Sequence, residues 1–173
     1  RIARPDTHLF IHTRRNREGA EKVATDVGLA GGVGEIDLAD LSDRGAGRGL
    51  VKRAALKLGG LDVLVANAGY ALRKSVLEAG DDAFEAAHGT MSRSFFEMAT
   101  AAIPHLRSSS AARIIVVSAF GPHVWRTQVP AFAVTSAAKA SMEAMAKALA
   151  LDLAPEGITV NVVAPGFIEK DAG

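Results

Sequence analysis

The stretch Leu61-Asp-Val-Leu-Val-Ala-Asn-Ala-Gly69 joins a short apolar run to a turn of small residues. The run Asp62–Ala66 has the length and composition of a strand buried on both faces of a parallel sheet. In the turn, Asn67 can hydrogen-bond to neighbouring backbone, and Gly69 lets backbone approach a flat ligand closely. An ordinary strand-to-helix turn looks the same, so the meaning of this stretch depends on its surroundings.

Four other short runs have the same character, and longer stretches with helical spacing separate all five. The additional predicted strands are His8–His12, Val33–Asp37, Arg113–Val117 and Thr159–Val163. The predicted helices are one capped by Asn16 that continues to Val27, one capped by Ser42 that ends near Gly59, one over residues 81–106, and Ser136–Leu153. This alternation predicts an α/β fold: a Rossmann-like, doubly wound parallel sheet with helices on both faces. Such sheets bind ligands at the carboxyl ends of their strands.

The composition narrows the classes of function. A chain of 173 residues with 49% hydrophobic residues fits one domain with a sizeable core. A net charge of +1 gives no reason to expect nucleic acid or an anionic membrane surface as partner. The chain has no cysteine, and its five histidines show no ligand spacing, so we expect no metal site. No apolar run approaches the roughly 20 residues of a membrane span. The absence of cysteine fits a reducing compartment, and we expect a cytoplasmic protein.

Three further features carry chemical groups near predicted strand ends. Ser118 directly follows the run Arg113–Val117, and its hydroxyl can donate to a carbonyl or an alkoxide. Lys139 is an isolated cation among small residues, and the last predicted strand leads into Pro165-Gly166. Each also has an ordinary interpretation, as a turn serine, a solvated helix lysine and a simple chain turn.

Taken together and in this order, these features resemble the short-chain dehydrogenase/reductase family. The matching segments are Ile36-Asp-Leu-Ala-Asp40, Val65-Ala-Asn-Ala-Gly69, Ser118-x-x-Gly121, Lys139 with its following helix, and Ile158-Thr-Val-Asn-Val-Val-Ala-Pro-Gly166. The resemblance implies roles for residues around a nicotinamide dinucleotide. These are Asp37 and Leu38 beside the adenine, Asn67, Ala68 and Gly69 along the cofactor, Lys139 on the nicotinamide ribose, and Pro165, Gly166 and Ile168 beside the nicotinamide amide.

Cofactor choice depends on the end of the first predicted strand. NAD-dependent enzymes usually place an acidic residue there, which accepts a hydrogen bond from the ribose 2′-hydroxyl. Here the strand leads into Arg14 and Arg15, whose guanidinium groups suit a 2′-phosphate in charge and geometry. A basic surface loop would look the same, but we expect NADP(H) to be preferred over NAD(H).

The catalytic positions depart from the family pattern. The family's Y-x-x-x-K motif places Thr135 where the tyrosine should be, and a count forward from Ser118 leads instead to Phe132. A phenol has a pKa of about 10, whereas an aliphatic hydroxyl is far too weak an acid to replace it directly. The family's catalytic asparagine falls on Met91. We therefore expect Ser118, Thr135 and Lys139 as the catalytic set, with Tyr70, His123 and His88 as other candidate proton donors.

The resemblance also implies that residues 1–173 form one nucleotide-binding domain, incomplete at both ends. The family's first strand, its glycine-rich phosphate loop, its substrate-covering segment and its last strand are not found in the sequence. The implied function is an NADP(H)-dependent oxidoreductase that interconverts a carbonyl and an alcohol in a small-molecule substrate. The alternatives are a non-catalytic nucleotide-binding protein and, ranked last, a cofactor-free dehalogenase-like lyase. A homodimer or homotetramer is expected in each case.

Overall fold

The five strands lie where the apolar runs predict them. A computed structural model describes residues 3–128 and 132–168. The strands are β1 (His8–Thr13), β2 (Val33–Leu38), β3 (Val63–Ala66), β4 (Arg113–Val117) and β5 (Thr159–Val163). Every boundary lies within one residue of its prediction, because turn residues flank each apolar run.

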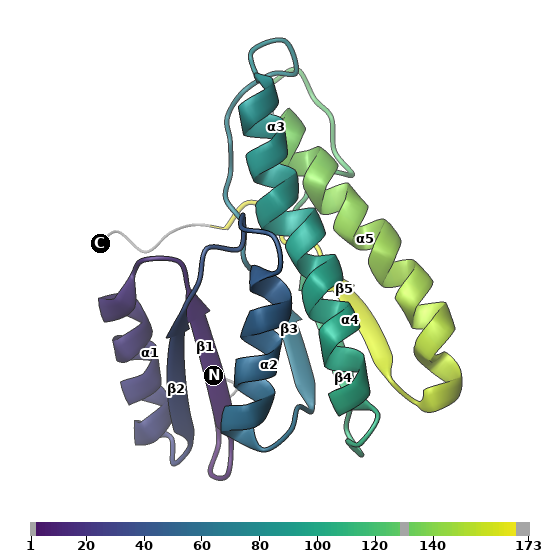
Figure 1. Ribbon diagram of the computed structural model, residues 1–173. Coiled ribbons are helices and arrows are strands. Elements are labelled where there is room, and N and C mark those ends of the chain that lie inside the picture. Colours follow the sequence, from purple (N-terminus) through teal and green to yellow (C-terminus); the bar gives the residue numbers. More distant parts are fainter. Residues whose placement is uncertain (1–2, 129–131, 169–173) are drawn as a thin grey trace.

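Helices alternate with these strands (Figure 1). They are α1 (Arg17–Leu29), α2 (Ala46–Leu58), α3 (Asp81–Ala87), a π-helical segment η1 (His88–Arg93), α4 (Ser94–Leu106), α5 (Ala133–Leu153) and a 3-10 turn η2 (Ala154–Glu156). The alternation confirms the predicted α/β class. The single helix predicted over residues 81–106 is wrong in one respect, because η1 interrupts it. Segments of this kind are often found at functional sites.

The strands form two parallel sheets rather than one. β1 pairs with β2, whereas β3, β4 and β5 form a second sheet in that order. A cleft of about 1050 Å³ lies between β1 and β3 and is lined by residues of both strands and of α2. Among the described residues, β1 and β3 therefore each pair along one edge only.

The strand register brings the carboxyl ends of the second sheet together. Ala66 is aligned with Val116, and Val117 with Val163. The residues that follow these strands therefore meet at one edge of the sheet, where the family resemblance places the site.

Helices cover opposite faces because the chain reverses direction across the sheet. Right-handed crossovers in opposite directions lie on opposite faces. The β1–α1–β2 crossover leads in one direction along the strand order, and the three later crossovers lead in the opposite direction, from β2 to β3, β4 and β5. Helix α1 therefore lies on one face and α2, α4 and α5 on the other (Figure 1). The main core lies under the latter group and includes the fully buried Met91, Phe95, Leu106, Ile114 and Met142.

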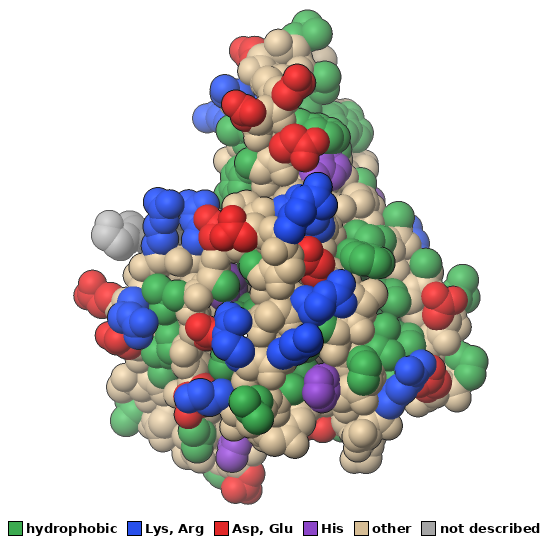
Figure 2. Space-filling view, viewed as in Figure 1, with side chains coloured by type: hydrophobic (Ala, Val, Ile, Leu, Met, Phe, Trp, Pro, Cys, Tyr) green, Lys and Arg blue, Asp and Glu red, His purple; other side chains and the backbone are tan. Residues whose placement is uncertain are grey.

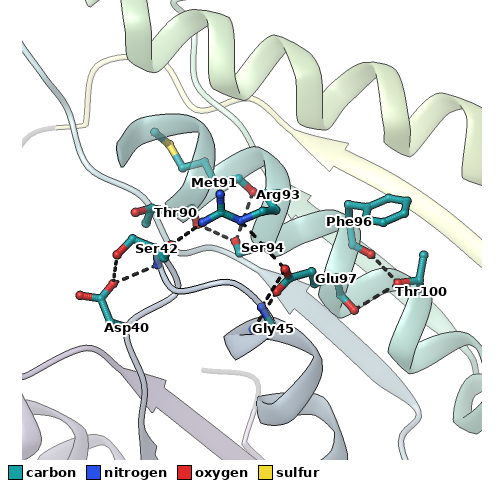
Figure 3. A network of polar contacts seen from close by, with 11 residues as sticks. Asp40, Ser42, Gly45, Thr90, Met91, Arg93, Ser94, Phe96, Glu97 and Thr100 are labelled. Atoms are coloured by element: carbon teal, nitrogen blue, oxygen red, sulfur yellow. Dashed lines mark hydrogen bonds and ion pairs between the residues drawn. The ribbon is translucent and has the colours of Figure 1, made fainter. Parts of the chain in front are cut away.

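The N-termini of the first two helices are capped differently. Asn16 accepts a hydrogen bond from the Gly19 amide at 2.9 Å, which confirms its prediction as a cap. The prediction that Ser42 caps α2 is wrong, since α2 begins only after Gly45, which has a φ of 82°. A carboxylate from α4 replaces the expected cap. Glu97 accepts from the amide of Gly45 at 2.9 Å (Figure 3). It also accepts from the amide of Gly47 at 3.2 Å.

Candidate cofactor and catalytic site

Lys139 lies buried at the carboxyl edge of the second sheet, with only 5% of its surface exposed. Its Nζ donates to the Val117 carbonyl at 2.6 Å. Gly69 packs against it: a Cβ at that glycine would lie 3.1 Å from the Lys139 Nζ and 3.1 Å from the Met91 Sδ. The turn after β3, the N-terminal half of α5 and η1 therefore meet at one point.

Desolvation by the surrounding protein lowers the pKa of the Lys139 ammonium below its ordinary value. An asparagine amide could accept a hydrogen bond from this ammonium, but Met91 contributes only a weakly accepting thioether. Lys139 is therefore a buried hydrogen-bond donor with spare capacity, which suits a ligand that brings its own oxygen acceptors.

Ser118 lies beside Lys139 but its hydroxyl points elsewhere. The hydroxyl donates to Oε1 of Glu143, and Nε2 of His123 lies 3.0 Å from the same oxygen. Ser118 and Glu143 are buried, whereas half of the His123 side chain is exposed. Sequence reasoning missed Glu143, although it lies four residues after Lys139 and so on the same face of α5.

Thr135 is also fully engaged in hydrogen bonds. Its hydroxyl donates to the Tyr70 carbonyl at 3.2 Å and accepts from the Leu72 amide at 3.0 Å. The residue at the family's tyrosine position thus ties the segment after Gly69 to α5. This segment continues to the exposed Val76 and Leu77. Figure 2 shows hydrophobic side chains at the top of the molecule, the end at which α3 lies.

A smaller cavity of about 350 Å³ lies at the carboxyl ends of β1, β2 and β3. Arg14, Ala68 and Gly69 from the predicted cofactor set line it, together with Tyr70 and Asp40. Burial raises the pKa of the Tyr70 phenol, and the nearby Arg14 lowers it to a lesser extent. The cavity combines a cation, a carboxylate, a phenol and small backbone-exposing residues, which are groups that suit an adenosine ribose.

The other predicted contacts lie around these two places. Asn67 lines the large cleft beside Ala68. Asp37 does not line the smaller cavity, because its carboxylate pairs with Arg53 of α2 at 2.5 Å and accepts from the Leu38 amide. Arg15 is exposed. After β5, the chain carries Pro165, Gly166 and the exposed Ile168, and Phe167 stacks against Phe120 with ring centroids 4.5 Å apart.

The part of the chain that the structure describes contains no cluster of three or more metal-ligating side chains. In that same part, no helix is both long and apolar enough to cross a membrane.

Comparisons with known proteins agree with this geometry. Residues 2–173 match a family model described as enoyl-(acyl carrier protein) reductase. Versicolorin reductase stcU of Emericella nidulans is 33% identical over 163 residues, which are 94% of this chain and 60% of that protein. The 3-oxoacyl-(acyl-carrier-protein) reductase FabG of Salmonella typhimurium is 31% identical over 161 residues, 93% of this chain and 64% of that protein.

A solved structure has the same fold. A short chain dehydrogenase from Burkholderia cenocepacia J2315, crystallised in complex with NADP, superimposes with a TM-score of 0.86 at 30% identity. The match covers 95% of this chain and 65% of that one. The chain thus spans less than two thirds of the length of each of these three proteins. A family match over almost all of its residues, together with relatives and a solved structure of the same family, shows that the chain belongs to the short-chain dehydrogenase/reductase family.

Proposed function

We propose that the protein is an NADP(H)-dependent oxidoreductase that interconverts a carbonyl and an alcohol. The observation that carries the proposal is the buried Lys139, held against Gly69 and the Val117 carbonyl at the carboxyl edge of the sheet. A nicotinamide ribose there would supply the acceptors that the ammonium lacks. Arg14 in the smaller cavity supports the preference for a 2′-phosphate.

In this proposal the nicotinamide, when bound, supplies or accepts the hydride. Lys139 orients the ribose through its Nζ. Asn67, Ala68 and Gly69 form the floor beside the cofactor, and Pro165, Gly166 and Ile168 border the nicotinamide. Asp37 and Leu38 would approach the adenine once Asp37 leaves Arg53.

Ser118 polarises the substrate oxygen in this proposal. Because its only proton is now donated to Glu143, the hydroxyl has to turn before it can donate to a substrate. Thr135 likewise has to leave both of its backbone partners to pass a proton through water. His123 is the better placed donor, because it is half-exposed and already lies 3.0 Å from the carboxylate that holds Ser118.

A second candidate is a nucleotide-binding protein that performs no chemistry. The observation in its favour is that the hydroxyls of Ser118 and Thr135 are both occupied by partners within the protein. Retention of the buried Lys139 is compatible with either candidate, since it holds the nucleotide in both.

The assembly and location that we propose follow the family. We propose a cytoplasmic homodimer or homotetramer in which α4 and α5 pack against their counterparts, as small residues along α5 permit close helix packing. Light scattering of the purified protein would test this, and a monomer at micromolar concentration would contradict it.

Calorimetric titration of the full-length protein with NADPH and NADH tests the function. The titration is followed by NADPH absorbance measurements with a panel of ketones and aldehydes. Tighter binding of NADPH with turnover on any member supports the oxidoreductase. Binding without turnover on the whole panel favours the non-catalytic candidate, and the absence of binding contradicts both.

A further inference from the structure

A carboxylate shares the smaller cavity with the arginine that is proposed to select NADP(H). Asp40 follows β2 and lines the cavity together with Arg14, which follows β1. The Asp40 Oδ2 and the Arg14 Nη1 are 3.8 Å apart. The sequence alone suggests a purely basic site at this edge, because the acid comes from the loop after a different strand.

The position of Asp40 is fixed from its other side. Oδ1 accepts from the Ser42 amide at 2.9 Å and from the Ser42 hydroxyl at 2.7 Å (Figure 3). The Ser42 carbonyl in turn accepts from the Arg93 guanidinium of η1. Asp40 is therefore held in place before any ligand arrives, and Figure 3 shows this network extending to Glu97.

The electrostatic surroundings keep Asp40 ionised. Hydrogen bonds from Ser42 lower the pKa of its carboxyl, and the charges of Arg14 and Arg15 lower it further. Both arginines thus act on the same carboxylate that faces the cavity. A 2′-phosphate in this cavity would meet the Arg14 cation together with the fixed Asp40 anion.

We propose that Asp40 is a specificity-determining residue that limits the preference for NADP(H). Its charge opposes a 2′-phosphate and engages Arg14, while it can accept a hydrogen bond from an unphosphorylated ribose hydroxyl. This inference rests on the proposed nucleotide site. It predicts a protein that also accepts NAD(H) and whose discrimination sharpens when the Asp40 charge is removed.

The test is Asp40→Asn in the full-length protein, with Asp43→Asn as matched control. Asparagine keeps an acceptor for Ser42, and the exposed Asp43 lies three residues further along the same loop. Dissociation constants for NADPH and NADH are measured by calorimetry, and those for 2′,5′-ADP and 5′-AMP isolate the effect of the phosphate. Asp40→Asn should raise the NADPH-to-NADH affinity ratio about three- to tenfold, whereas Asp43→Asn should change it less than about twofold.

The outcomes separate this inference from the function on which it rests. If the wild type binds NADPH but the ratio is unchanged in Asp40→Asn, or changes equally in both variants, the inference is overturned and the proposed function stands. If the wild type binds neither nucleotide, both are overturned. Thermal melts identify a misfolded Asp40→Asn protein, and Asp40→Ser then provides the same comparison, since serine also retains an acceptor.

Discussion

Lys139 occupies an energetically costly position for an amino group. A buried ammonium loses hydration, and the only hydrogen-bond acceptor described for its Nζ is the Val117 carbonyl. Residues retained at a cost in stability are often those that function requires. Removal of the Lys139 charge should therefore stabilise the folded protein and weaken its binding of nucleotide.

Lys139→Met is expected to raise the free energy of unfolding by about 1 kcal/mol at neutral pH, since the variant buries an apolar side chain of similar length. It should also weaken NADPH binding at least about tenfold. Urea unfolding and calorimetry measure the two effects. A variant that is less stable than the wild type would contradict the idea that the charge is costly.

The stability difference should depend on pH in a definite direction. The folded-state pKa of Lys139 is lowered from 10.5, so the unfolded chain holds more protons as pH rises toward that value. The free energy of unfolding of the wild type therefore rises with pH in the window that ends near 10.5. In that window, the difference in free energy of unfolding between Lys139→Met and the wild type becomes smaller. Paired melts at pH 7 and 9.5 would show this, and a gap that widens at the higher pH would refute it.

Ser118→Ala tests the role of the hydroxyl in turnover. If Ser118 polarises the substrate oxygen, kcat should fall about 10²- to 10³-fold, and the dissociation constant for NADPH should change less than twofold, about the limit of resolution. NADPH absorbance assays give the first quantity. Unchanged kcat would assign Ser118 to holding Glu143 alone.

The strands and turns that bring Lys139 and Gly69 to the same edge of the sheet were predictable from sequence, whereas the roles of these residues stay predictions. Lys139 and Gly69 meet there, and Met91 joins them. Hydrogen-bond partners were not predictable, because they depend on side-chain directions. The engagement of Ser118 with Glu143 and the presence of Asp40 in the cavity both arise from contacts between segments distant in sequence.

At the scale of elements, α2 shows how a distant residue can determine where a helix begins. The Glu97 carboxylate accepts from two amides at the start of α2 and lies 4.0 Å from Arg93. The negative charge of this carboxylate also interacts favourably with the partial positive charge at the N-terminus of α2. The predicted start of α2 was wrong because Ser42 is a plausible cap by local sequence, whereas the actual acceptor, Glu97, lies about 50 residues further along the chain.

Glu97→Ala is expected to lower the free energy of unfolding by about 1–3 kcal/mol, because two amides at the N-terminus of α2 lose their acceptor. Glu85→Ala in α3 is a suitable control, since no hydrogen bond or ion pair is described for its side chain. Chemical denaturation measures both. Equal effects of the two substitutions would mean that the cap contributes nothing.

At the scale of the whole molecule, the division into two sheets leaves β1 and β3 with unpaired edges along the cleft. Apolar runs and turn residues predicted where the strands lie. Which strands pair with each other depends on long-range packing, which these local patterns do not specify. A further strand could pair with both of these edges. An edge strand left open invites pairing with another chain.

Amide hydrogen exchange should be slow in β4 and faster in β1 and β3, because β4 is the one strand among the described residues that is paired along both edges. Equal exchange rates in β1, β3 and β4 would contradict this prediction.

The Glu97 contact with α2 has a consequence for the order of folding. The hydrogen bonds to Gly45 and Gly47 span 52 and 50 residues of sequence. During synthesis on the ribosome, the N-terminus of α2 emerges well before its acceptor exists, so the helix cannot complete its first turn in this way until α4 has followed. Closing so long a loop costs chain entropy, which slows folding. A nascent chain that ends before residue 97 should therefore hold α2 only as a fraying helix.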